Sequence, residues 1–201
     1  MSEHVRSSRS LQSDLRYHRT RLLSDPNTSH LAVLCDGVGA DLKERMQHSE
    51  SAADAQVEAS ARRTACEVTA DRACSQVEAI MLGEVGRNRQ EPRYLECLPK
   101  GLSYLIALSG REQAEAMHRF VDKLTEQFPA LAKRFGKELI AAADALASAD
   151  DQHGKLMRVA TMARADEQIA RLGVSRQFDR NEAALYVIYP GDRKLVRSFF
   201  K

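Results

Sequence analysis

The stretch LAVLCDGVGADL, residues 31–42, decides the fold class of this chain. It fits either a short buried strand that ends in a glycine loop or one face of a helix. In the helical interpretation its apolar residues share a face, because they recur at steps of three and four. Gly37 and Gly39 would each cost ~1 kcal/mol in such a helix and would mark a bend or the close approach of another helix. The shared face consists of Leu31, Leu34, Cys35, Val38 and Leu42.

In the strand interpretation, Gly37 and Gly39 line a loop and Asp36 faces a metal ion. The fragment CDGVGA, residues 35–40, resembles the Asp-Gly-x-Gly-Gly stretch of metal-dependent serine/threonine phosphatases, which gather acidic ligands from several strands of a large β sandwich. This chain has Ala40 in place of the second glycine of the pair, no other Asp-Gly element, and little strand-like sequence. We therefore predict a helix over this stretch.

The helical pattern extends well beyond residue 42. Residues 29–87 contain no proline, no aromatic residue occurs between Tyr17 and Tyr94, and alanine is abundant. These features predict one helix of up to roughly 60 residues, or two in line, which at 1.5 Å per residue would be about 90 Å long. A helix of that length needs partners along its sides. The predicted partner-binding seam comprises Leu31, Leu34, Val38, Leu42, Val57, Val68, Val77 and Ile80.

The composition of the 201 residues also favours helices. Glycine and proline are scarce, there is no tryptophan, and 43% of the residues are hydrophobic against 29% charged. A chain with few turn formers and few aromatic residues does not suit a many-stranded β fold. We predict an all-α protein, a long antiparallel helical bundle with a coiled-coil-like, alanine-rich helix.

Three segments are predicted along the chain. Residues 1–25 form a basic N-terminal helical segment, residues 26–91 the alanine-rich coiled-coil arm, and residues 92–201 a helical bundle half with aromatic residues in its core. The clearest break is GRNRQEPRYLECLPKG, residues 86–101, which holds two glycines and two prolines. Ten of the 11 Tyr and Phe residues follow residue 93, so the better-filled core is expected to involve this last segment.

Several signals predict helix boundaries after residue 101. Ser109 and Glu112 have the spacing of a capping box, and Pro129 should bend or restart a helix. The stretch SADDQHG, residues 148–154, and Gly173 are both expected to end helices. The tail from 183 to 201 fits a hairpin or two short helices, and we favour helices.

Charge and cysteine usage restrict the class of protein. The net charge of +2 is too balanced for a nucleic-acid binder, and no apolar run reaches the 18 residues of a membrane span. The basic stretches 16–21 and 192–201 remain alternative contacts for nucleic acid or an anionic membrane. The four cysteines lack a CxxC pair, which is typical of buried thiols in a reducing, cytoplasmic protein.

One pair of residues suggests metal chemistry. Glu115 and His118 lie three apart on a predicted helix, as in ferritin-like bundles that bind transition metals. Such bundles use two Glu-x-x-His pairs, and this chain has one; the nearest analogue, Asp150 to His153, falls in a predicted turn. A surface glutamate and histidine are the simpler interpretation, so we assign no catalytic residue, metal ligand or cofactor.

These patterns predict a non-enzymatic role. Long helices with exposed apolar seams must meet each other or another copy of the chain. We expect a structural or adaptor-like helical protein that forms a homo-oligomer and presents a surface to a protein partner. The metal-binding bundle built on Glu115 and His118 is the alternative.

Overall fold

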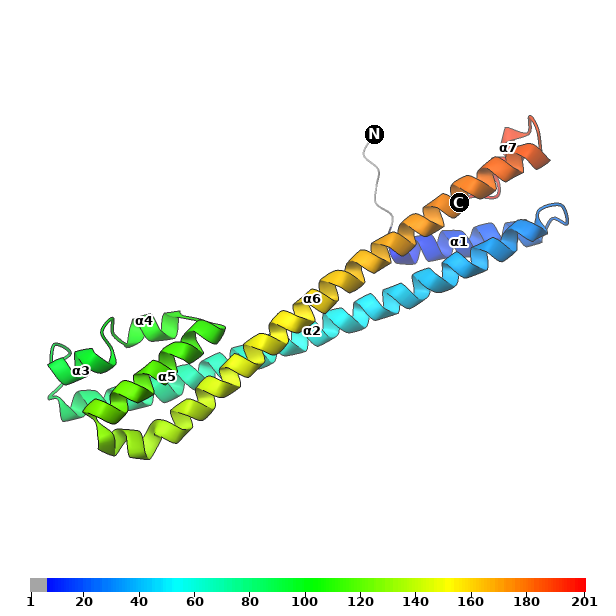
Figure 1. The fold of residues 1–201 in the computed structure, drawn as a ribbon. Coiled ribbons are helices and arrows are strands. Elements are labelled where there is room, and N and C mark those ends of the chain that lie inside the picture. Colours follow the sequence, from blue (N-terminus) through cyan, green and yellow to red (C-terminus); the bar gives the residue numbers. More distant parts are fainter. Residues whose placement is uncertain (1–6) are drawn as a thin grey trace. The chain divides into compact units, whose positions relative to one another are not determined.

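The computed structural model describes residues 7–201, and within them it contains helices and no strand. The all-α prediction is therefore confirmed, and α2 is the predicted long, alanine-rich helix (Figure 1). The helices are α1 (Ser8–Leu23), α2 (Ser29–Glu84), α3 (Pro92–Cys97), α4 (Leu102–Ala107), α5 (Gly110–Gln127), α6 (Pro129–Ile188) and α7 (Arg193–Arg197).

The chain folds as two compact units, and both long helices take part in both. Among the described residues, unit 1 holds 7–54 and 159–201, whereas unit 2 holds 55–158. This division differs from the three predicted segments, whose limits were placed at turns near residues 25 and 91. The limits of the units fall inside α2 and α6 instead, because a compact unit is defined by side-chain packing and a helix can continue from one core into another.

Unit 1 combines α1, the first part of α2, the last part of α6, and α7. The α2 and α6 segments run antiparallel, since Cys35 contacts Asn181 while Arg45, further along α2, contacts Asp166, further back on α6. α1 begins at the N-cap Ser7, whose hydroxyl accepts a hydrogen bond from the Ser10 amide. The buried apolar residues are Leu11, Leu15, Leu22, Leu31, Ala32, Cys35, Leu42, Ala170, Val174, Leu185, Val196 and Phe199.

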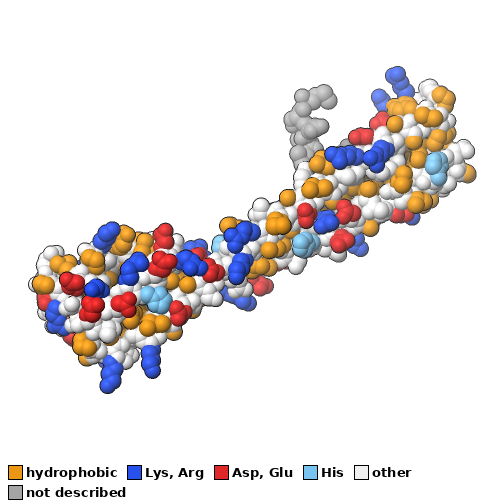
Figure 2. Space-filling model, in the orientation of Figure 1, with side chains coloured by type: hydrophobic (Ala, Val, Ile, Leu, Met, Phe, Trp, Pro, Cys, Tyr) orange, Lys and Arg blue, Asp and Glu red, His pale blue; other side chains and the backbone are white. Residues whose placement is uncertain are grey.

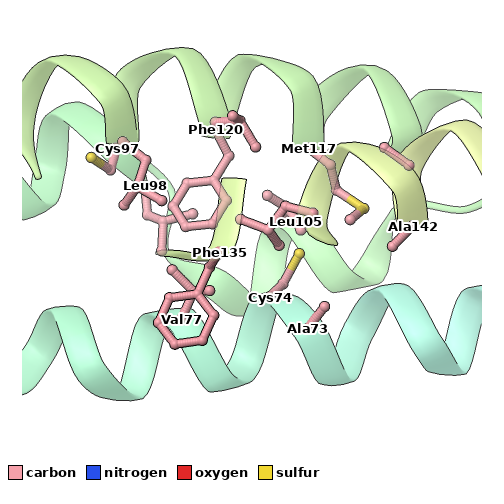
Figure 3. Packing of buried hydrophobic residues seen from close by; sticks show 14 of the residues in the cluster. Ala73, Cys74, Val77, Cys97, Leu98, Leu105, Met117, Phe120, Phe135 and Ala142 are labelled. Carbon is pink, nitrogen blue, oxygen red and sulfur yellow. The ribbon is translucent and has the colours of Figure 1, made fainter. Parts of the chain in front are cut away.

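Unit 2 contains the larger apolar core. Side chains from α2, α3, α4, α5 and α6 meet in one cluster, and Figure 3 shows Val77, Leu105, Met117, Phe120 and Phe135 within it. Burying one such side chain contributes roughly 1.5–3 kcal/mol, so this cluster is the main source of stability in the unit. The better-filled core thus involves the segment 92–201, as predicted, through residues between 94 and 146, and it also contains part of α2.

The stretch 31–42 is helical, as predicted. As predicted for a glycine in this helix, another helix approaches α2 closely at Gly39. A Cβ added to Gly39 would lie 3.1 Å from Cδ2 of Leu15 on α1. Gly37 has no such neighbour. Asp36 forms an ion pair with Arg19 on α1, so its carboxylate links two helices of unit 1.

Two predicted helix ends are wrong. α6 continues through residues 148–154 and through Gly173 without interruption. An isolated glycine costs a helix only ~1 kcal/mol, and packing of the neighbouring residues in each unit outweighs that cost. Pro129, by contrast, does restart a helix, because it is the first residue of α6, where a proline leaves no amide unpaired.

The predicted capping box is also wrong. Ser109 is the N-cap of α5, but its side chain makes no capping hydrogen bond. Carboxylates from the two long helices take its place: the Gly110 amide donates to Glu67 on α2 at 3.3 Å, and the Arg111 amide donates to Asp150 on α6 at 3.3 Å. Sequence spacing could not reveal this cap, because both acceptors are about 40 residues away.

The tail is helical rather than a hairpin. α6 ends at Ile188, and the turn at Pro190 and Gly191, with Gly191 at φ 84°, leads into α7. Phe199 is buried, at 1% exposed, and belongs to the core of unit 1. The last residues of the chain are therefore packed against the unit, as predicted.

Candidate functional site

The predicted seam of α2 is divided between the interior and the surface. Leu31, Leu42 and Val77 are buried in the cores of their units, and Val38 and Ile80 are partly buried against them. The remaining three are exposed: Leu34 at 55%, Val57 at 68% and Val68 at 53%. The buried members stabilise the chain itself, so only the exposed ones are free for contact with a partner.

A second apolar face lies on α6 in unit 1, and it was not among the sequence-based predictions. Met162, Ile169 and Leu172 are 68%, 66% and 47% exposed, and Ala165 between them is exposed as well. Their steps of three, four and three are those of a coiled-coil seam. We call Met162, Ala165, Ile169 and Leu172 the outer stripe of α6.

The side of α6 that faces the unit is made of smaller residues. Ala160 and Ala163 are buried with Ala52 of α2, at 0%, 1% and 6% exposed. Alanine lets two helix backbones approach closely and leaves little room for larger side chains. In this part of unit 1, α6 therefore buries Ala160 and Ala163 and exposes the larger Met162, Ile169 and Leu172. A helix with no partner on its outer side would gain more from the opposite arrangement.

Polar residues surround the outer stripe. Arg176 and Arg180 continue the same face of α6 towards its C-terminus, and both are exposed. Figure 2 shows hydrophobic and basic side chains next to one another on the surface of this part of the molecule. An apolar centre with a polar rim is typical of protein-interaction sites.

The sequence pair Glu115 and His118 lies on the surface of α5. Nε2 of His118 is 3.0 Å from Oδ1 of Asp144 on α6, and the two side chains are 42% and 65% exposed. Among residues 7–201, no group of three or more His, Cys, Asp or Glu side chains is placed to hold a metal ion. The structure therefore brings together one histidine and one aspartate here, not the four carboxylates and two histidines of a dinuclear site.

The cysteines are core residues, as predicted. All four are free thiols; Cys35, Cys74 and Cys97 are buried and Cys66 is half-buried. Burial raises the pKa of Cys74 to about 12 and that of Cys97 to about 11, so both thiols are protonated at neutral pH. Because the thiolate is the reactive form, these cysteines are poor nucleophiles and poor metal ligands.

A buried polar network joins four parts of unit 1. Nδ1 of His18 on α1 donates to the Phe199 carbonyl at 2.9 Å, and its Nε2 accepts from the Asn181 amide on α6 at 2.9 Å. The same amide contacts Sγ of Cys35 at 3.4 Å, and Gln177 donates to Oδ1 of Asn181 at 2.8 Å. Each of these polar groups is satisfied by another, which fixes the C-terminal residues against α1.

The surroundings of His18 keep its ring neutral. Burial lowers the pKa of His18, against the opposing effect of its hydrogen bond to Phe199. The Phe200 ring stacks on the imidazole with centroids 4.4 Å apart, and the Phe178 ring meets it edge-on at 5.4 Å. With both nitrogens engaged and the ring enclosed, His18 serves packing rather than acid–base catalysis.

The basic N-terminal stretch is used within the unit. Arg19 pairs with Asp36, and the Arg21 guanidinium lies 5.4 Å from the centroid of the Phe199 ring. These contacts account for two of the charges that suggested an external anionic partner. No helix in the part of the chain that the structure describes combines the length and the hydropathy that a membrane span requires.

Comparisons with protein families, with curated proteins and with solved structures find no match to this chain. Among the described residues, the outer stripe of α6 is the strongest candidate for a functional surface.

Proposed function

We propose that the chain is a non-enzymatic, structural or adaptor-like helical protein that self-associates and presents a surface to other proteins. The contact between copies is the outer stripe of α6. The observation that supports this proposal is that α6 buries Ala160 and Ala163 while the larger Met162, Ile169 and Leu172 are exposed. The four free thiols support a reducing, cytoplasmic setting for this role.

The spacing of the stripe suggests how two copies meet. A seam at steps of three and four packs well against a copy of itself, because each side chain fits between those of the facing helix. A two-fold contact of this kind uses the same patch on both copies and closes without leaving an open end. Val57, Ala61, Thr64 and Val68 form a second exposed row, on α2 in unit 2, which remains free for a different partner.

The test is the solution mass, measured by light scattering behind a gel-filtration column. We expect a multiple of 22.4 kDa for the unaltered protein. The variant Ile169→Glu should have the mass of a monomer, because a carboxylate in the centre of an apolar contact would be desolvated without a partner.

A matched control is available on α2. Val33 is 68% exposed, close to the 66% of Ile169, and lies outside the stripe. Val33→Glu should leave the mass unchanged. A monomeric unaltered protein at every concentration would refute self-association, and an equal effect of both variants would refute the assignment to α6.

A further inference from the structure

Unit 2 contains a pocket that the proposed function does not use. It has a volume of about 310 Å³ and lies between the end of α3, the following turn, α4 and α5. Its floor is apolar, and four of the residues that line it, Cys97, Leu98, Leu105 and Phe120, belong to the buried core. Figure 3 labels these four side chains within that core. This volume is at the lower end of the roughly 300–1,000 Å³ of small-molecule sites, which are also mostly apolar.

Cationic side chains stand at the rim of this pocket. Lys100, Arg119 and Lys123 line it together with one carboxylate, Glu96. Nζ of Lys123 donates to Glu126 at 2.7 Å, which neutralises that ammonium in part. The rim therefore keeps a net positive charge, to which Lys100 and Arg119 contribute most.

Two side chains at the rim suit a ligand with one charged end. Nζ of Lys100 lies 4.3 Å from the centroid of the Tyr104 ring, and this ring is 48% exposed. Arg119 is exposed on α5, and a guanidinium binds a carboxylate through two parallel hydrogen bonds. Burial raises the pKa of the Cys97 thiol to about 11, so the floor carries no negative charge that would oppose an anion.

We infer that this pocket binds a small amphiphilic carboxylate, with its alkyl chain on the apolar floor and its carboxylate at Arg119 and Lys100. The apolar floor favours a ligand with an alkyl chain, and the excess of positive charge at the rim favours a negatively charged head group. The pocket shares no residue with the outer stripe of α6, so this inference is independent of self-association.

Calorimetric titration of the full-length protein with decanoate tests the inference. Decyltrimethylammonium is the matched probe, because it has the same chain and the opposite charge. We expect saturable binding of decanoate at one site, and binding of the cation at least about tenfold weaker, since a charged contact of this kind is worth a factor of that order.

Two variants locate the site. Arg119→Glu should weaken decanoate binding by about tenfold or more, and Ala116→Phe should abolish it by filling the pocket that Ala116 lines. Lys133→Glu makes the same reversal of charge and Ala130→Phe the same substitution at exposed positions of α6 outside the pocket, and both variants should bind decanoate normally. The thermal transition of each variant, followed by circular dichroism, shows that it is folded.

Loss of binding in the two pocket variants alone, with preference for the anion, would support the inference. Equal binding of both probes, equal effects of pocket and control variants, or no saturable binding of decanoate would overturn it. None of these results depends on the solution mass. Ligand binding can therefore be refuted while self-association is supported, and self-association can be refuted while ligand binding is supported.

Discussion

The two units of this molecule fill their interiors in different ways. Unit 2 packs one large cluster of apolar side chains, in which Met117, Leu124 and Leu139 are completely buried. Unit 1 has a smaller apolar cluster and places a chain of buried polar groups, from His18 through Asn181 to Gln177, within it. Both interiors are built from the same two long helices.

The comparison of the two units distinguishes what apolar contacts contribute to a fold from what buried hydrogen bonds contribute. Apolar contacts are non-directional and give most of the free energy of folding, so unit 2 should resist unfolding more strongly. Hydrogen bonds give a small net stabilisation each, but they require one particular arrangement of donors and acceptors. In unit 1 this requirement determines where the C-terminal residues pack, because the Phe199 carbonyl is one of the acceptors.

The largest effect is expected from the same substitution made once in each core. Leu139 and Leu185 both lie on α6 and are both fully buried, in unit 2 and unit 1 respectively. Replacing either with alanine should lower the free energy of unfolding by ~2–5 kcal/mol. Hydrogen exchange should show the loss of amide protection in unit 2 for Leu139→Ala and in unit 1 for Leu185→Ala. Loss of protection throughout the chain in both variants would mean that the units unfold as one.

A smaller effect is expected when the polar network of unit 1 is broken. Asn181→Leu removes the partner of Nε2 of His18 and of the Gln177 side chain, and an unpaired buried polar group costs ~1–3 kcal/mol. Denaturant unfolding measures the change. Gln47→Leu, which also replaces an amide side chain with leucine at an exposed position of α2 in unit 1, is the control and should change stability by less than about 0.5 kcal/mol. Equal stability of Asn181→Leu and the unaltered protein would show that the network adds nothing to the apolar contacts around it.

The smallest effect is expected from pH. Burial holds the pKa of His18 below its usual value, which is about 6.5 in the unfolded chain. As the pH falls below that value, the unfolded state takes up a proton that the folded state does not, so stability decreases by up to ~1.4 kcal/mol per pH unit. Stability at neutral pH is unaffected, because His18 is then neutral in both states.

Unfolding free energies measured across the mildly acidic range test this dependence. Asp14 and Lys201 line the same small pocket as His18, and their opposite charges have opposing effects on the pKa of the imidazole. His18→Phe should be less sensitive to acid than the unaltered protein, since the titrating group is gone. If both proteins lose stability equally between pH 6.5 and the pKa of the carboxylates, another group is responsible.

The amino-acid sequence was sufficient for the fold class and for the local course of the chain. The steps of three and four in residues 31–42, the absence of proline in 29–87, and Pro129 at a helix start all act through neighbouring residues, and each prediction from them is confirmed. The helix ends predicted at Gly154 and Gly173 are wrong because a glycine lowers helix stability only modestly, and the contacts of other residues outweigh that cost. Propensity is a local quantity, so it predicts local structure well but cannot show where distant contacts carry a helix past a glycine.

Tertiary structure decided which apolar residues are inside. Leu31 and Leu34 occupy one predicted face of α2, yet Leu31 is buried and Leu34 is 55% exposed. On α6, the large apolar residues Met162 and Ile169 lie on the surface, while the smaller Ala160 and Ala163 are buried. Periodicity shows which residues share a face of a helix, but what that face meets depends on how closely distant segments approach, and only the packed chain determines that distance.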